Sequence, residues 1–146
     1  MKKVFAILTI GFAIAATACA DNDVISRNTN DLPAPARATL KQHFPHAKVS
    51  YIKIEKEWPW STTYEVQLVH GAEISFNSKG EWIEVDCKQE AVPVAFIPAQ
   101  IRNQVEEMFP GEQITKIEKD SRDYEVELYN DVDLKFNKKF KIVEVD

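Results

Sequence analysis

The sequence predicts an α+β fold, built as a tandem duplication of a helix followed by a four-stranded antiparallel sheet, with the helices packed on one face. Three observations lead to this prediction. Segments of the chain recur in a fixed order, helical spacing of apolar residues opens each copy, and strict apolar–polar alternation follows it. The length of 146 residues suits one compact domain or two very small ones.

The internal repeat is clearest in the strand segments. Residues 64–68 (YEVQL) return as residues 124–128 (YEVEL), and residues 84–86 (EVD) return as residues 144–146. Both pairs lie 60 positions apart and keep their order along the chain. The predicted organisation is a signal peptide over residues 1–20, a flexible tether over 21–30, a first unit over 31–86, a linker over 87–94 and a second unit over 95–146.

A helix opens each unit. Pro33 and Pro98 stand at the predicted helix starts, where a missing N–H costs nothing because the first turn offers it no partner. A Phe-Pro pair ends each helix, since the residue before proline disfavours the helical conformation. Between these signals, apolar residues recur every four positions: Ala36, Leu40 and Phe44 in the first unit and Ile101, Val105 and Phe109 in the second.

Four strands follow each helix. Residues 64–68 and 124–128 alternate apolar and polar side chains, which is typical of an antiparallel strand with one face in solvent. Because a unit of about 55 residues makes a thin core alone, we expect the two units to pack together or to share a continuous sheet. The predicted solvent face is acidic: it carries Glu65, Glu73 and Glu84 in the first unit and Glu125, Glu127, Asp133 and Glu144 in the second.

Residues 1–20 have the pattern of a secretory signal peptide, with two lysines, an uncharged apolar stretch too short to span a bilayer, and small residues at its end. Two routes of processing remain open. One is cleavage after Ala20; the other is lipidation of Cys19, which follows a segment that resembles a bacterial lipobox. We therefore expect an exported protein, attached to the membrane only if Cys19 carries a lipid.

The repeated motifs resemble a known family. A proline-started helix ending in Phe-Pro, a Tyr-Glu-Val-x-Leu strand, a Phe-Asn strand end and a closing Glu-Val-Asp are similar to the PepSY-like secreted and periplasmic proteins of Bacteroides-type bacteria. That family is similar to the beta-lactamase inhibitor protein, which is also a tandem of helix-plus-four-strand units. The resemblance covers about residues 31–146. It implies an envelope protein without established catalysis, in the periplasm or at the outer membrane or cell surface of a Gram-negative bacterium, with inhibition of an enzyme as an analogy.

The sequence contains no pattern that indicates catalysis. It has neither a glycine-rich phosphate loop nor a Gly-x-Ser-x-Gly motif, and its net charge of −5 with no long basic run disfavours nucleic acid. Two cysteines are too few for a disulfide framework, and we expect Cys87 to be buried. His43 and His46 have a metal-ligand spacing, but Pro45 separates them at the helix end. We expect no enzyme, no cofactor, no metal site and no nucleic-acid partner.

Aromatic residues form the candidate site. Trp58 and Trp60 flank Pro59 in a loop that is longer than its counterpart in the second unit, and alternation places Tyr51 and Trp82 on the polar face. One interpretation is that the indoles of the loop fold back onto the sheet or seal the junction of the units. The other is that Tyr51, Trp58, Trp60 and Trp82 form a patch that binds a partner.

The predicted function is that of a non-catalytic binding module of the cell envelope. Its partner would be an envelope protein or peptide, and its candidate role is inhibition of a protein or peptidase through the sheet face and the loop of residues 58–60. The alternative is a small-ligand or cation-binding protein that uses the acidic sheet face.

Overall fold

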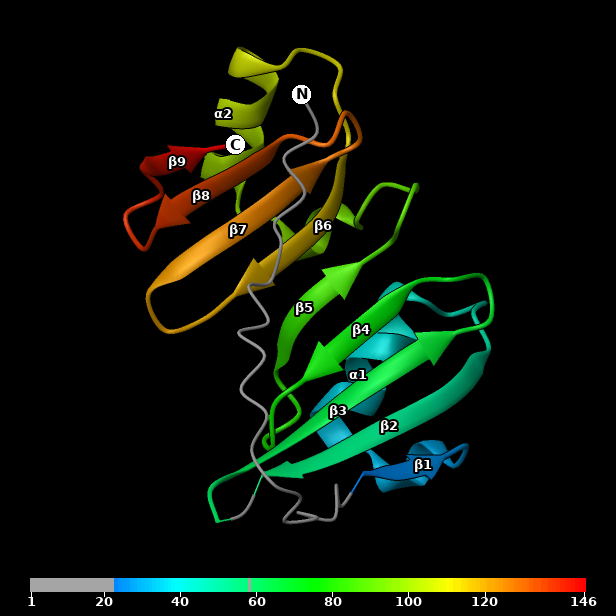
Figure 1. The fold of residues 1–146 in the computed structure, drawn as a ribbon. Coiled ribbons are helices and arrows are strands. Elements are labelled where there is room, and N and C mark those ends of the chain that lie inside the picture. The colour runs from blue at the N-terminus through cyan, green and yellow to red at the C-terminus, as the bar shows by residue number, and fades with distance from the viewer. Residues whose placement is uncertain (1–22, 58) are drawn as a thin grey trace, which may run out of the picture.

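The computed structural model describes residues 23–57 and 59–146. Within these residues the chain forms a single antiparallel sheet of nine strands, whose order in space is their order in the sequence (Figure 1). The strands are β1 (Val24–Ser26), β2 (Val49–Glu57), β3 (Ser61–Leu68), β4 (Glu73–Phe76), β5 (Trp82–Asp86), β6 (Ile114–Lys119), β7 (Asp123–Leu128), β8 (Asp133–Asn137) and β9 (Ile142–Val145). The helices are α1 (Ala34–His43) and α2 (Ala99–Met108), with short 3-10 turns η1 (Thr29–Asp31) and η2 (Val94–Phe96).

The α+β class is correct, but the prediction of two four-stranded sheets is wrong. Strand β5 of the first unit pairs with β6 of the second, with Val85 opposite Ile117, so the sheet continues through both units. Two separate sheets would each leave a row of unpaired backbone N–H and C=O groups at this position. Joining β5 to β6 satisfies these groups and merges two thin cores into one.

The expected flexible tether over residues 21–30 is wrong in its described part. Val24–Ser26 form β1, which pairs antiparallel with β2 and places Val24 opposite Ile54. The side chain of Asn28 then accepts a hydrogen bond from the backbone N–H of Asn30, 3.0 Å away, and caps η1. A segment of only three residues can form a strand here because the long strand β2 offers it a free edge for backbone pairing.

The two helices begin and end where the sequence predicts. Pro33 and Pro98 are the residues immediately before α1 and α2. At the other end of α1, Phe44 leaves the helical conformation while its N–H still donates to the carbonyl oxygen of Leu40, at 2.9 Å. The apolar stripe on each helix is buried through Ala36, Leu40, Ile101 and Val105. Of the helices that the structure describes, neither is long and apolar enough to cross a membrane.

A single hydrophobic core lies between the sheet and the helices. Figure 1 shows α1 behind the strands of the first unit and α2 behind those of the second. Burial of each large apolar side chain here stabilises the fold by about 1.5–3 kcal/mol. Cys87 is buried at the edge of this core, as expected. The fully buried strand residues include Ile52, Val66, Ile74, Phe76, Val85, Ile117, Val126, Leu134 and Phe136.

The opposite side of the sheet, called here the open face, carries the alternate residues of each strand. Neither described helix packs on it (Figure 1). Its side chains are mostly charged and partly exposed, as the alternation in the sequence predicts. The fold therefore presents one covered apolar face and one broad polar face.

Candidate functional site

The hairpin between β2 and β3 holds an exposed indole at its tip. Trp60 is 90% exposed, and its backbone N–H donates to the carbonyl oxygen of Glu57 at 2.9 Å, which closes the turn. For Trp60, therefore, the interpretation that the loop folds back onto the sheet is wrong. Trp58 lies outside the described residues, and its part in the patch stays a prediction.

The hairpin projects beyond the strands beside it. The β2–β3 pairing runs as far as Glu57 opposite Ser61, whereas β4 ends its pairing with β3 at Tyr64. On the other side, β1 pairs with β2 only as far as Ile54. The end of the hairpin therefore stands free of both neighbours and carries Trp60 away from the sheet.

Tyr51 lies on the open face, as predicted. It pairs with Gln67 of β3 and is half-buried, on the side of β2 opposite to the buried Ile52 and Ile54. It is six residues from the end of β2 at Glu57, which is about 20 Å at the usual rise of about 3.3 Å per residue. Tyr51 and Trp60 therefore belong to one strand and its turn but do not form a contiguous patch.

The predicted orientation of Trp82 is wrong. A register shift between Ser75 and Phe76 of β4 places Trp82 opposite Phe76, whose ring is fully buried on the helix side. An irregularity of this kind moves a side chain from one face to the other, and the apolar–polar pattern does not reveal it. Trp82 packs edge-on against Phe96, with ring centroids 5.4 Å apart, and lies away from the face that carries Tyr51.

The open face carries many carboxylates and a few lysines, which form ion pairs with some of them. Lys116 lies 3.7 Å from Glu84, and Lys135 lies 3.5 Å from Asp123. Such partly exposed ion pairs each contribute at most about 1 kcal/mol to stability. Further pairs join Lys53 to Asp23 and Glu55, and Lys88 to Glu73 and Asp86.

Partial burial raises the pKa values of several carboxylates on the open face, and neighbouring carboxylates add to the effect. Partial burial, followed by the charge of neighbouring Glu73, raises the pKa of Glu65. Glu127 of β7 pairs in register with Asp133 of β8. Its pKa is raised mainly by partial burial and, to a smaller extent, by the charge of Asp133. Burial is also the main cause of the raised pKa values of Glu84 and Asp133. The carboxylates of the open face are thus partly desolvated, which disfavours their charged form.

An acidic hollow of about 160 Å³ lies on the open face near the C-terminal edge of the sheet. Its lining includes Glu125, Asp133 and Glu144, with Lys135 among them. In the part of the chain that the structure describes, no group of three His, Cys, Asp or Glu side chains is placed to hold a metal ion.

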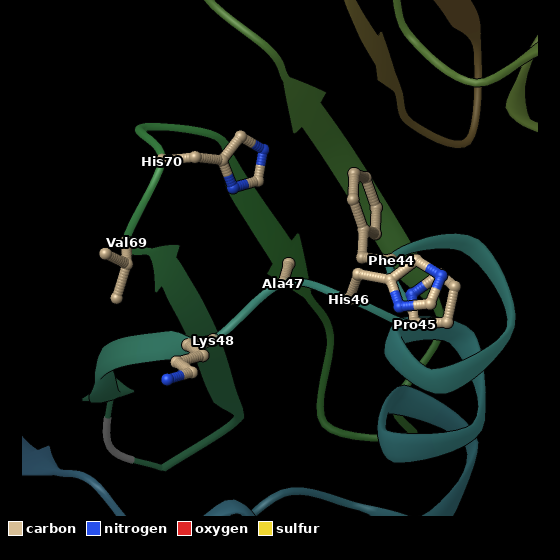
Figure 2. Close-up of a pocket in the computed structure, with 7 residues that line it drawn as sticks. All are labelled: Phe44, Pro45, His46, Ala47, Lys48, Val69 and His70. Atoms are coloured by element: carbon tan, nitrogen blue, oxygen red, sulfur yellow. The ribbon is translucent and has the colours of Figure 1, made fainter.

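A mostly apolar hollow of about 510 Å³ lies where α1 leads into β2. Figure 2 shows Phe44 and His46 contributed by the segment after α1, and His70 contributed by the β3–β4 turn. His43 takes no part, because its ring packs on Phe96 with centroids 4.6 Å apart. The sequence patterns described above do not predict this hollow. Its signal in the sequence is the Phe-Pro pair, which places the ring of Phe44 just beyond the end of α1.

Both the sequence and the fold match known proteins. The family model described as "Putative beta-lactamase-inhibitor-like, PepSY-like" matches residues 16–68 and 62–144. The chain belongs to the PepSY-like family. The resemblance inferred from the repeated motifs is thereby confirmed.

Solved structures of Bacteroides proteins are similar to this PepSY-like chain. One, a "putative periplasmic protein of unknown function" from Bacteroides vulgatus ATCC 8482, is 40% identical, with a TM-score of 0.81 over 85% of this chain and 98% of that one. A second "putative periplasmic protein" from the same organism is 39% identical, with a TM-score of 0.82 over 87% and 98%. A "putative calcium-regulated periplasmic protein" from Bacteroides thetaiotaomicron is 40% identical, with a TM-score of 0.80 over 85% and 96%. No curated protein is significantly similar to the chain.

These comparisons confirm the periplasmic location that the sequence predicts, since all three relatives are described as periplasmic. The signal peptide and Cys19 fall within residues 1–22, outside the described residues, so cleavage and lipidation stay predictions. The description of the family as inhibitor-like does not test whether the chain has catalytic activity. The non-catalytic role therefore also stays a prediction.

Proposed function

We propose that this PepSY-like protein is a non-catalytic binding module of the cell envelope, which recognises a protein partner through the β2–β3 hairpin and the adjoining open face. The observation that carries the proposal is the 90% exposure of Trp60 at the tip of the projecting hairpin. Tryptophan is enriched among the residues that dominate binding energy, because it buries a large rigid surface at small entropic cost. Pro59 restricts the turn that presents it.

The second unit offers an internal comparison. Its equivalent hairpin, between β6 and β7, does not project, because Asp123 at the start of β7 is still paired with Asn137 of β8. The segment between β6 and β7 contains no aromatic residue. The projecting indole is thus found in the first unit alone. A turn with a purely structural role would be expected in both units, whereas a loop that binds a partner would not.

The charge of the open face supports a basic partner surface. Carboxylates outnumber lysines on this face, and burial or crowding raises the pKa values of Glu65, Glu84, Glu127 and Asp133. A partner that brings lysine or arginine to the rim would relieve this crowding and fix the orientation of the complex. Where the partner is an enzyme, occlusion of its site by the hairpin would produce inhibition, consistent with the description of the family.

The test compares binding by the wild type and by Trp60→Ala. The partner is first captured from envelope extract and identified, and its affinity is then measured by calorimetry with purified components. We expect Trp60→Ala to weaken binding by about ten-fold or more, since a central tryptophan contributes about 2 kcal/mol. Tyr129→Ala, an exposed aromatic on the β7–β8 turn, is the matched control and should change the affinity little. Equal affinities for the wild type and Trp60→Ala would contradict the proposal.

A second candidate is the binding of a divalent cation on the open face. Glu127 and Asp133 are register partners with raised pKa values, and one relative is described as calcium-regulated. This candidate predicts that Ca²⁺ raises the melting temperature, because a ligand of the folded state stabilises it, and that Asp133→Asn reduces the rise. An unchanged melting temperature at millimolar Ca²⁺ would eliminate it.

A further inference from the structure

The sheet has two edge strands, β1 and β9, which Figure 1 shows at its opposite ends. Among the described residues, no strand pairs with the outer edge of either one. An open edge presents unpaired backbone N–H and C=O groups, to which another strand can bind. Both edge strands also carry apolar side chains in solvent: Val24 and Ile25 in β1, and Val143 and Val145 in β9, are between 49% and 61% exposed.

The edge of β9 repeats the edge through which β5 binds the second unit. Residues 144–146 (EVD), at the end of β9, have the sequence of residues 84–86, at the end of β5. Each strand also has a register shift against the strand before it. Val85 of β5 pairs with Ile117 of β6 and is fully buried, whereas its counterpart Val145 is 49% exposed. In the part of the chain that the structure describes, β9 therefore lacks the strand that covers β5.

The backbone groups of Val145 face this open edge. Asp146 and Asp133 of β8 exchange hydrogen bonds, at 2.9 Å in each direction. Adjacent residues of an antiparallel strand turn their N–H and C=O groups to opposite sides, so those of Val145 point away from β8. In β5 the N–H of Cys87 donates to a carbonyl oxygen of β6 at 2.9 Å, and the groups of Val85, two residues earlier, face β6 in the same way.

The chain contains a second strand of the kind that covers β5. Val66 of β3 and Val126 of β7 are counterparts in the internal repeat. Val66 pairs with Ile52 of β2, as Val126 pairs with Ile117 of β6. Strand β2 is therefore the counterpart of β6. If the arrangement of the two units is repeated once more, β2 of a second copy lies against β9, with Ile52 opposite Val145.

The charges of the two edges are complementary in this register. Glu144 of β9, next to Val145, would lie opposite Lys53 of the second copy, which follows Ile52. Opposite charges that face each other across two strands stabilise their pairing. In the single chain, Lys53 already has a carboxylate from the segment of β1 beside it, because Asp23 lies 3.4 Å away. Glu144 would take the place of that carboxylate.

Strand β1 covers this edge of β2 in the single chain. It pairs Ser26 with Ile52 and Val24 with Ile54, over only three residues. Because β1 belongs to the same chain, its high effective concentration favours it over a strand from another molecule. This competition limits assembly, since a contact between two different edges otherwise adds molecules without end unless it closes into a ring.

We propose that the outer edge of β9 binds the outer edge of β2 in a second copy of this chain, where it displaces β1. The contact pairs Val145 with Ile52 and Glu144 with Lys53, and it continues the sheet from one molecule into the next. It uses neither Trp60 nor the tip of the β2–β3 hairpin. The inference therefore goes beyond the proposed function, and each can fail without the other.

The test mixes two proteins that each have one usable edge. The first is Val24→Pro/Ile25→Pro/Val145→Pro. Because adjacent residues turn their N–H groups to opposite sides, the first two prolines remove a donor of β1 that faces β2. The third blocks the edge of β9 and spares its bonds to β8. The second protein is the wild type, in which β1 covers β2 and the edge of β9 is open.

Sedimentation velocity measures association in the two proteins and in their mixture. We expect each protein alone to be monomeric at micromolar concentration, and the mixture to contain a complex with one molecule of each. Association in the mixture should be about ten-fold tighter, or more, than association of the wild type with itself, because β1 no longer competes. Val24→Pro/Ile25→Pro/Val145→Thr, which keeps the N–H at position 145, should assemble beyond dimers.

Three controls separate charge, folding and surface. Glu144→Lys in the wild-type component should weaken the complex by roughly five-fold or more, whereas Glu107→Lys, exposed on α2, should not. Asp23→Lys/Ile25→Lys places like charges near Lys53 and displaces β1 without proline, so with Val145→Pro it should form the same complex. Trp60→Ala should leave the complex unchanged, and thermal unfolding confirms that each variant is folded.

Each of the other outcomes would overturn the proposal. Folded components that form no complex would show that β9 does not bind β2. Dimers of the wild type alone, as tight as those of the mixture, would show that β9 pairs with β9 or that β1 does not cover the binding edge. Dimers of the three-proline protein alone would show that two β2 edges pair with each other. A complex that Glu144→Lys and Glu107→Lys affect equally would contradict the pairing with Lys53.

Discussion

Phe96 is the residue that joins the parts of the first unit to one another and to the linker. Its ring is 3% exposed and contacts three others, those of His43, Phe44 and Trp82, at centroid distances of 4.6, 6.0 and 5.4 Å. Phe96 lies in the short turn η2, and its ring links the end of α1 to β5. Trp82, which alternation would place in solvent, is held in this cluster.

Replacing Phe96 should be among the most destabilising single changes. Phe96→Ala is expected to lower the free energy of unfolding by about 3–5 kcal/mol, because it removes a large buried ring and leaves a cavity. The neighbouring Val94, which is 60% exposed, is the control, and Val94→Ala should cost no more than about 0.5 kcal/mol. Urea unfolding of the two variants measures the difference; equal costs would contradict the role assigned to Phe96.

Gly80 meets a second local constraint, in the turn between β4 and β5. Its φ is +81°, and a Cβ there would lie 2.8 Å from the Cβ of Pro33 and 3.0 Å from the N of Ala36. The turn therefore needs glycine both for its left-handed conformation and for close contact with the start of α1. Phe140, at φ 58° in the β8–β9 turn, adopts a similar conformation and stacks its ring on Tyr124.

Comparison of two glycines separates conformational strain from close contact. Gly111 has nearly the same φ, +79°, but a Cβ there would meet nothing within 4 Å. Gly111→Ala should therefore cost about 1 kcal/mol for backbone strain alone, and Gly80→Ala should cost at least about 1 kcal/mol more. Thermal unfolding of both variants tests this, and a similar loss in each would show that the contact with α1 does not constrain Gly80.

At the scale of the elements, partial burial of carboxylates on β7 and β8, with the charges of their acidic neighbours, sets a pH dependence. Glu127 and Asp133 face each other across these strands, and the pKa of each is raised in the folded protein. The folded state therefore holds protons that the unfolded chain has already released. This contribution to stability is largest below the ordinary carboxyl pKa of about 4 and declines as pH rises through the raised values.

Asp133→Asn should remove part of this dependence. At neutral pH we expect it to raise the free energy of unfolding by up to about 1 kcal/mol, because it removes a partly buried charge and the repulsion between that charge and Glu127. Near pH 4 the gain should shrink, since the raised pKa values leave Glu127 and Asp133 more protonated there than at neutral pH. Glu107→Gln, exposed on α2, controls for loss of one negative charge. A gain that is equal at both pH values, or absent, would contradict the assignment.

At the scale of the whole molecule, the nine strands form one sheet across the two units. Val85 of β5 and Ile117 of β6, both fully buried, are paired at the junction. The sheet and its core should therefore unfold in a single transition, with equal calorimetric and van't Hoff enthalpies. Val85→Ala should lower the melting temperature of the whole molecule; two resolved transitions in either protein would show that the units are independent.

Sequence periodicity predicts the helices and most strands because each depends on local spacing. The four-residue stripe from Ala36 to Leu40 and the alternation in residues 124–128 are both found in the structure. Pairing between β5 and β6 depends on which strand edges meet, and alternation carries no information about that choice. The register shift that places Trp82 on the helix side of the sheet also depends on backbone geometry.

The central claim, that the β2–β3 hairpin contacts a protein partner, is tested most directly by photocrosslinking in cells. A benzophenone amino acid replaces Trp60 in one variant and the exposed Tyr129 in another. We predict a discrete adduct of one envelope protein from position 60 and none from position 129. Irradiation that gives no adduct at position 60, or equal adducts at both positions, would contradict the proposed function.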